Sequence, residues 1–244
     1  MTKPDITPRY YEQGFDEVVA SLRNDVLPDG AERIAETPDF RVFKIQHTVG
    51  PLIVRVSTPD QYRDDGLTSR QGTIKRIRAL EAGRGLPHYE QVHTHNTTDE
   101  AIVTHEALGD ELRKLPLATV LGITREELQD MAAATKLPNA SRLSMDSDPE
   151  NIFYAPWVGL TAVDYSLRKP REENIPVNDF GYILQGIGGN IIDDSSHPEL
   201  AAAWLRVYEE GLRILRDDGV EPYNLHRDFE NYHNLLQWQA RDAL

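Results

Sequence analysis

The sequence predicts an α+β fold with a small antiparallel sheet in its first part and mostly helices in its second. Strand-like apolar runs between residues 40 and 56 come early in the chain, and apolar residues at helical spacing predominate after residue 107. The composition, with 39% hydrophobic and 27% charged residues over 244 positions, is that of a folded chain rather than a disordered one. We therefore expect two parts, residues 1–106 and residues 107–244.

The first part begins with an expected amphipathic helix over Tyr10–Leu22, which ends near Pro28-Asp29-Gly30. Two strand-like runs follow, Phe40–Ile45 and Leu52–Val56, with the turn signal Val49-Gly50-Pro51 between them. We interpret them as a hairpin.

Residues 74–80 carry apolar positions at helical spacing, and Gly83-Arg84-Gly85 would end this helix. Ala101-Ile102-Val103 has the character of a short strand. The apolar pattern breaks at residues 106–109, so we expect the connection between the two parts there.

The second part contains a capping-box pattern, Thr124 with Glu127, which predicts a helix through Ala134. Later residues with helical apolar spacing occupy 180–184, 200–215 and 229–240. Gly186-Ile187-Gly188-Gly189 is not preceded by a strand, as a dinucleotide motif requires, so we expect a flexible loop there.

The charge balance is acidic: 26 Lys and Arg oppose 40 Asp and Glu, for a formal net charge of −14. Such a chain disfavours non-specific binding to nucleic acid or to an anionic membrane. A nucleotide partner stays compatible, because salt screens a distant acidic surface beyond roughly 8–10 Å from a local cationic pocket. The acidic balance also suits a cationic small substrate.

The chain has no cysteine, which excludes disulfides, thiolate metal sites and cysteine nucleophiles. Its first residues lack an apolar stretch of signal-peptide length, and no later run approaches the roughly 20 apolar residues that span a bilayer. We therefore expect a cytoplasmic protein without a membrane partner.

Three polar residues carry the chemistry that the sequence suggests. Asp146 and Asn151 are five residues apart in the pattern D-x-x-P-E-N, and Asp164 follows an apolar run thirteen residues later. Phosphoryl transfer needs a carboxylate at the acceptor hydroxyl and oxygen ligands for magnesium bound to the phosphates. These residue types match that requirement.

The segments 143–152 and 160–166 resemble the catalytic loop and metal-binding strand of the aminoglycoside and choline phosphotransferase family, which read L-H-G-D-x-x-P-x-N and an apolar strand ending in Asp. The resemblance implies a two-lobed protein kinase-like fold. It also implies that Asp146 is the catalytic base, and that Asn151 and Asp164 hold Mg²⁺. The co-substrate would be ATP or GTP, and the acceptor a hydroxyl of an aminoglycoside, amino alcohol or sugar-like molecule.

The same resemblance assigns Arg55 to the strand position of the cation that contacts the nucleotide phosphates, with Lys44 as a second candidate. The family's helix glutamate falls near Thr73 or Lys75, and Glu81 is in a poor register. Ser144 and Met145 replace the family's histidine and glycine, and no glycine-rich loop occurs between residues 34 and 43. The resemblance also makes Asp179 a structural residue that braces the catalytic loop.

Several of these residues also have plainer interpretations. Asp146 could be a turn aspartate, because Asp-Ser-Asp-Pro favours turns, and Arg55 could face solvent on an edge strand. We interpret His93 and His95 as part of a solvated polar loop. Leu225-His226-Arg227-Asp228 mimics a protein-kinase catalytic loop but lacks an asparagine five residues later, so we expect a helix cap or an interhelix contact.

The expected function is a phosphotransferase that moves the γ-phosphate of ATP or GTP to a small-molecule hydroxyl. The alternative is a catalytically weak or inactive pseudokinase-like binding or regulatory protein, which the missing glycine loop and helix glutamate favour. A nucleotidyl-transferring or protein-modifying enzyme that uses the same metal aspartate is a third possibility, and nothing in the sequence favours it.

Overall fold

A computed structural model describes residues 17–37, 40–47, 49–58, 69–95, 101–137, 140–146, 148–167, 179–220 and 223–242. These residues form two compact units. Unit 1 contains the described residues up to Arg84 and those of Glu90–Glu106, and unit 2 contains Gly85–Tyr89 and the described residues from Ala107 onward. An antiparallel sheet in unit 1 and predominantly helices in unit 2 confirm the α+β class.

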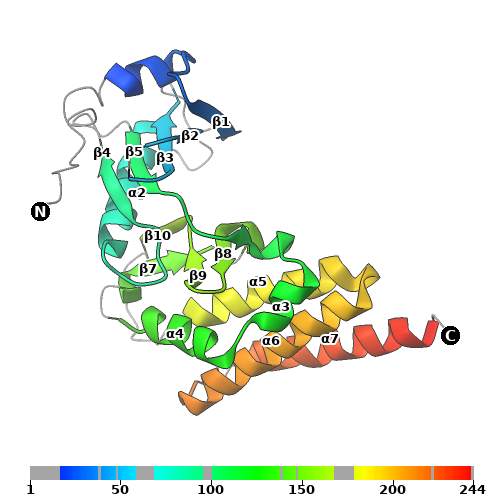
Figure 1. Ribbon diagram of the computed structural model, residues 1–244. Coiled ribbons are helices and arrows are strands. Elements are labelled where there is room, and N and C mark those ends of the chain that lie inside the picture. Colours follow the sequence, from blue (N-terminus) through cyan, green and yellow to red (C-terminus); the bar gives the residue numbers. More distant parts are fainter. Residues whose placement is uncertain are drawn as a thin grey trace, which may run out of the picture. The chain divides into compact units, whose positions relative to one another are not determined.

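Unit 1 is built on a five-stranded antiparallel sheet with strand order β1-β2-β3-β5-β4 (Figure 1). The strands are β1 (Ala31–Glu36), β2 (Phe40–Ile45), β3 (Leu52–Ser57), β4 (Val92–His95) and β5 (Ala101–His105). The predicted hairpin is confirmed as β2 and β3, in which Phe43 pairs with Val54. The short strand predicted at Ala101 is confirmed as β5.

The two faces of this sheet have different environments. One face is apolar and packs against Val18, Val19 and Leu22 of the helical residues 17–23. Its sheet residues alternate along each strand, as a half-buried sheet requires: they are Phe43, Ile45, Leu52, Val54, Val56, Ala101 and Val103. Arg55 and Thr104 project from the opposite face, and α2 (Ser69–Gly83) packs against β3, β4 and β5.

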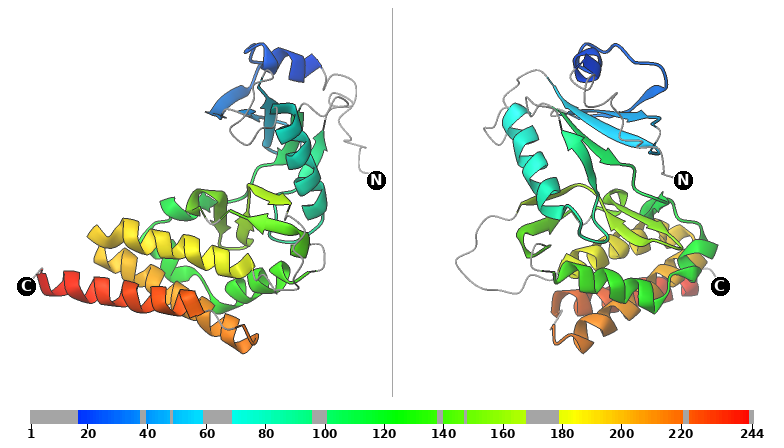
Figure 2. Two further views of the ribbon diagram at one scale, coloured as in Figure 1. Left: turned by 180° about the vertical axis from the view of Figure 1, so that it is seen from behind. Right: turned by 60° about the vertical axis from the view of Figure 1, so that its left-hand side comes forward.

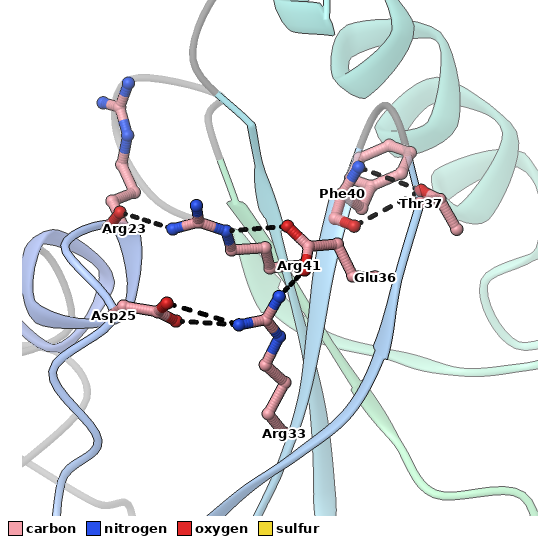
Figure 3. Close-up of polar contacts among 7 residues, drawn as sticks. All are labelled: Arg23, Asp25, Arg33, Glu36, Thr37, Phe40 and Arg41. Atoms are coloured by element: carbon pink, nitrogen blue, oxygen red, sulfur yellow. Dashed lines mark hydrogen bonds and ion pairs between the residues drawn. The ribbon is translucent and has the colours of Figure 1, made fainter.

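Ion pairs join β1 and β2 to the chain that follows the helical residues 17–23 (Figure 3). Arg33 pairs with Asp25 at 3.2 Å and with Glu36, and Arg41 pairs with Glu36 at 3.3 Å. Arg41 also donates to the carbonyl oxygen of Arg23 at 2.9 Å. These groups are partly exposed, so each pair contributes at most about 1 kcal/mol. They stabilise the edge strand β1 and do not form a ligand-binding site.

Two expectations for this unit are wrong, and one of its strands was not predicted. The opening helix ends at residue 23 and not near Pro28, and its part before residue 17 lies outside the described residues. His93 lies in strand β4 instead of a solvated loop, and β1 has no counterpart among the predicted elements. Ala31–Glu36 reads AERIAE, a charged pattern without strand alternation, which hides an edge strand.

Unit 2 combines five helices with two small antiparallel sheets, ordered β6-β8-β9 and β10-β7. Its strands are β6 (Asp110–Glu111), β7 (Leu143–Met145), β8 (Ile152–Ala155), β9 (Gly159–Ala162) and β10 (Tyr165–Leu167). Its α-helices are α3 (Leu117–Gly122), α4 (Arg125–Thr135), α5 (Asp179–Asp193), α6 (Pro198–Asp217) and α7 (Tyr223–Asp242). Short 3₁₀ segments occupy Leu112–Lys114, Ala140–Arg142, Pro149–Asn151 and Asp194–Ser196.

The predicted capping box at the start of α4 is confirmed. The Glu127 backbone N–H donates to Thr124 Oγ1 at 3.2 Å, and the Thr124 N–H donates to Glu127 Oε2 at 2.9 Å. Two backbone donors at the helix start are thereby satisfied, which contributes about 1 kcal/mol to the helix.

Helices α5, α6 and α7 pack against one another, and α3 and α4 pack against α6 (Figures 1 and 2). The loop predicted at Gly186–Gly189 is wrong, because these residues lie inside α5. A Cβ on Gly188 would come within 2.6 Å of Tyr232 Oη, so the glycine allows α7 to approach closely. Packing therefore overrides the low helix propensity of glycine.

The Leu225–Asp228 segment lies within α7, and Arg216 of α6 contacts His226 there at 3.1 Å. The predicted interhelix contact is confirmed. Within the part of the chain that the structure describes, no helix has the length and apolar character needed to cross a membrane.

Candidate active site

The antiparallel pair β7–β10 and the hairpin β8–β9, which lies between them in the sequence, bring the backbone of Asp146, Asn151 and Asp164 together in unit 2. We call these residues the Asp146 site. Met145 pairs with Tyr165 at the end of the β7–β10 ladder, so Asp146 and Asp164 follow and precede that pair directly. Ile152 pairs with Ala162 in the β8–β9 ladder. The Val163 N–H donates to the carbonyl oxygen of Asn151 at 2.8 Å, so the residue that precedes Asp164 is hydrogen-bonded to Asn151.

Asp164 lies between two strands and has a left-handed backbone conformation, with φ of 53°. The prediction that an apolar strand ends at Asp164 is therefore wrong in detail, since β9 already ends at Ala162. Residues other than glycine rarely adopt positive φ, and strained backbone of this kind concentrates at functional sites. The side chain of Asp164 is exposed.

Asp146 has features of both of its interpretations. Its Oδ1 accepts the backbone N–H of Asp148 at 3.1 Å, which is the turn contact that the plainer interpretation predicts. Asp148 in turn accepts the N–H of Glu150 at 3.0 Å and caps the 3₁₀ segment that ends at Asn151. The side chain of Asp146 is exposed, so its carboxylate is accessible to a ligand as well as to the turn.

The turn between Asp146 and Asn151 rests on α5. Pro149 is buried, and its Cγ would lie 3.7 Å from a Cβ on Gly189, an ordinary van der Waals distance, so the turn lies against this part of the helix. Asp179, the first residue of α5, is 1% exposed. Its burial agrees with the structural role expected of it.

The donor set of the Asp146 site fits magnesium. Asn151 supplies an amide oxygen and Asp164 a carboxylate, and hard oxygen ligands of this kind are what Mg²⁺ prefers. Among the described residues, no group of three or more histidine or acidic side chains is arranged to hold a metal ion. Magnesium commonly takes one or two protein ligands and phosphate oxygens, so this finding does not conflict with the fit.

In unit 1, Arg55 lies on the central strand β3, between β2 and β5, and the edge-strand interpretation is wrong. Its Nη1 donates to Glu90 Oε1 at 2.6 Å and to Thr104 Oγ1 at 3.0 Å. The Thr104 hydroxyl donates to the same Glu90 oxygen at 2.7 Å. Arg76 of α2 pairs with Glu90 Oε2 at 3.3 Å. We call Arg55, Arg76, Glu90 and Thr104 the Arg55 network.

Glu90 is the buried centre of this network, with 3% of its surface exposed. Burial by itself raises the pKa of Glu90, but the charges of Arg55 and Arg76 and the hydrogen bond from Thr104 outweigh it, so the pKa falls below its ordinary range. Glu90 is therefore ionised and shared by two guanidinium groups.

Sequence reasoning did not identify Glu90 as the partner of Arg55. Glu81, the nearest helix carboxylate, pairs instead with Arg84 at 2.8 Å. Glu90 precedes β4 in a short segment without periodic pattern, 35 residues from Arg55. Only tertiary structure joins the two.

Lys44 lies on β2 and pairs with Glu106 Oε1 at 2.7 Å. Both side chains are about one-third exposed, with values of 30% and 33%. The turn between β1 and β2 contains Thr37 and has no glycine, and its Pro38 and Asp39 lie outside the described residues.

Three histidines of unit 1 form a cluster. The ring centroids of His93 and His105 are 5.2 Å apart, and those of His93 and His47 are 6.0 Å apart. Burial lowers the pKa of His93, and the neighbouring imidazoles of His105 and His47 lower it further. The predicted loop histidine is thus part of a cluster in which its own neutral form is favoured.

The chain matches no protein-family model, and no curated protein matches it significantly.

Proposed function

We propose that this chain is a phosphotransferase of protein kinase-like, two-lobed architecture that transfers the γ-phosphate of ATP or GTP to a hydroxyl of a small molecule. The observation that carries the proposal is the convergence of Asp146, Asn151 and Asp164 at the ends of the β7–β10 pair and of the β8–β9 hairpin. The left-handed backbone of Asp164 supports a functional role, because strained backbone of this kind concentrates at functional sites.

In this proposal each residue has one task. Asp146 accepts a hydrogen bond from the acceptor hydroxyl and takes its proton as the oxygen attacks phosphorus. Asn151 and Asp164 hold Mg²⁺, which when bound neutralises charge on the phosphates. The 3₁₀ segment at Pro149 keeps Asn151 at a fixed distance from Asp146 along the turn. Arg55 and Lys44 contribute positive charge for the nucleotide phosphates.

The test is a thermal-shift titration of the wild type and of Asp164→Asn with ATP and with GTP, each with and without magnesium. We expect a magnesium-dependent rise in melting temperature that the variant loses, because a ligand that binds the native state stabilises it by mass action. Asp130→Asn is the matched control, since Asp130 is an exposed aspartate on α4 of the same unit. A shift unchanged in Asp164→Asn would contradict the proposal.

A pseudokinase-like binding protein is the second candidate, and the Arg55 network favours it. The partner of Arg55 is Glu90 rather than a helix carboxylate, and α2 offers the cation Arg76 at that place. A scaffold that binds nucleotide without turning it over would give the same thermal shift. Incubation with radiolabelled ATP and a panel of aminoglycosides, amino alcohols and sugars separates the two, since only the transferase yields a phosphorylated product.

A further inference from the structure

Arg113 joins two segments of unit 2 beside the Asp146 site. Its Nη1 donates to Glu150 Oε1, and its Nη2 lies 4.0 Å from Asp148 Oδ1 and 3.7 Å from Asp193 Oδ2. Asp148 and Glu150 belong to the turn of the Asp146 site, whereas Asp193 is the last residue of α5. One guanidinium group therefore bridges this turn and the end of the helix against which the turn packs.

The backbone that carries Arg113 is held by packing. Arg113 is the middle residue of the 3₁₀ segment Leu112–Lys114, and the side chain of Leu112 is fully buried. This segment contacts the 3₁₀ segment Pro149–Asn151, and it also contacts α5 and β8. The side chain of Arg113 therefore reaches the turn from a backbone that the core of unit 2 keeps in place.

The carboxylates that Arg113 contacts also take part in the hydrogen bonds of the turn. Asp148 Oδ1, which lies near Arg113, accepts the Glu150 N–H at 3.0 Å. The Asp148 N–H donates to Asp146 Oδ1 at 3.1 Å, and the Asn151 N–H donates to the Asp148 carbonyl oxygen at 2.9 Å. Because Asp148 is hydrogen-bonded to Asp146 and to Asn151, a contact that restrains Asp148 also restrains both site residues of the turn.

Repulsion among carboxylates makes this contact important. The segment from Asp146 to Glu150 carries three acidic residues in five positions, and like charges at this spacing repel one another. Asp193 adds a carboxylate at the carboxyl end of α5, where the helix dipole disfavours negative charge. Among the described residues, Arg113 is the cation that pairs with Asp148, Glu150 and Asp193. A single exposed pair is weak, whereas several charges joined in a network are held better.

We propose that Arg113 is a positioning residue that holds the turn of the Asp146 site in the conformation that places Asp146 and Asn151 for their tasks. Arg113 itself contacts neither metal nor substrate, and it acts through Asp148 and Glu150. The ordering of the turn does not depend on any reaction, whereas its effect on magnesium and nucleotide rests on the proposed function. Without Arg113 the turn opens locally while unit 2 stays folded.

Amide hydrogen exchange measured by NMR on the full chain tests the order of the turn, because three of its N–H groups donate within it. Arg113→Gln should raise the exchange rates of these amides about fivefold. Salt screens exposed pairs, so the same rates should rise with salt in the wild type and lose this dependence in Arg113→Gln. Arg113→Lys keeps the charge without the planar fork, so its rates should lie between those of the wild type and of Arg113→Gln.

Arg125→Gln is the matched control. Arg125 is as exposed as Arg113, with 43% of each side chain accessible, and it pairs with two carboxylates of the same unit, Glu210 and Asp217. These carboxylates lie on α6, so the control should leave the exchange rates of the turn and their salt dependence unchanged. Unchanged rates in Arg113→Gln, or an equal change in Arg125→Gln, would overturn the positioning role.

Nucleotide binding separates failure of this proposal from failure of the proposed function. If Asn151 holds Mg²⁺, Arg113→Gln should raise the Kd of magnesium-ATP or magnesium-GTP about threefold and leave the Kd of the metal-free nucleotide unchanged. If the turn responds to Arg113→Gln but the wild type binds no magnesium-nucleotide, the ordering of the turn by Arg113 stands and the phosphotransferase assignment falls. If binding depends on Asp164 but is equal in the wild type and Arg113→Gln, the assignment stands and the positioning role falls.

Discussion

The Arg55 network of unit 1 and the Asp146 site of unit 2 differ in how their charged groups are held. Glu90 is buried and contacts Arg55, Arg76 and Thr104, so the fold of the sheet depends on the network. Asp146 and Asp164 are exposed, Asp146 accepts a hydrogen bond from its own turn, and Asp164 has a left-handed backbone. The comparison teaches that the stability of unit 1 should be sensitive to its charges, whereas unit 2 should tolerate loss of its carboxylates.

The largest expected effect is that of Glu90→Gln, which removes the buried carboxylate that Arg55 and Arg76 share. We expect unit 1 to lose about 3–5 kcal/mol of unfolding free energy, because removing one partner of a buried ion pair leaves a buried charge. Hydrogen exchange of backbone amides in β3 and β5 reports on unit 1. All three tryptophans, Trp157, Trp204 and Trp238, belong to unit 2, so their fluorescence should change little.

Glu81→Gln is the control for this prediction, since Glu81 forms an exposed ion pair with Arg84 on the same unit. Exposed pairs contribute at most about 1 kcal/mol, so Glu81→Gln should change the exchange of β3 and β5 little. Equal effects of the two substitutions would show that burial does not distinguish the network.

The two sites also differ in how far the sequence predicts them. The Asp146 site could be found because its residues lie within nineteen positions of one another and two short antiparallel strand pairs bring them together. The partner of Arg55 could not, because Glu90 reaches it through tertiary contacts and its own segment has no period. Local spacing thus predicts local geometry, and a buried ion pair between distant segments needs the fold.

The elements follow the same division. Strand β2 carries apolar alternation, β3 and β5 are short apolar runs, and α4 begins with a capping box, and each was predicted from those signals. β1 carries its charges on an edge, where strand alternation is weak, and β4 is a short strand between polar residues. The glycines of α5 suggest a loop from sequence alone, because the sequence does not show that Tyr232 packs against Gly188. The elements that were not predicted are those whose conformation depends on contacts with neighbouring elements.

Asp164→Gly should change stability in the opposite direction, with a gain in unfolding free energy in unit 2. Glycine adopts positive φ without the steric cost that Asp164 bears, so the variant should gain about 0.5–1 kcal/mol in unit 2 by urea denaturation followed through tryptophan fluorescence. The same variant should lose the magnesium-dependent nucleotide shift. Asp130→Gly in α4 should instead lose about 1 kcal/mol, because glycine destabilises a helix interior. A destabilised Asp164→Gly would contradict the interpretation of strain.

The smallest effect concerns the histidine cluster, and it tests whether charge sensitivity in unit 1 extends beyond Glu90. Burial and the neighbouring imidazoles lower the pKa of His93 below its ordinary value of 6.5, and burial lowers that of His47. The unfolded chain therefore binds more protons near this pH than the folded chain. The cluster's contribution is fully present above about pH 6.5 and is lost as the pH falls through the lowered pKa of His93. The lowered pKa of Glu90 acts at more acidic pH.

Urea titrations followed by far-ultraviolet circular dichroism at pH 7.5 and pH 5.5 measure this loss, which should stay below about 1 kcal/mol because the rings are only partly buried. His93→Gln should reduce the difference between the two pH values, and His197→Gln, at an exposed histidine of unit 2, should leave it unchanged. If His93→Gln keeps the full pH dependence, the acid sensitivity belongs to other groups, and the charge dependence of unit 1 is confined to the Arg55 network.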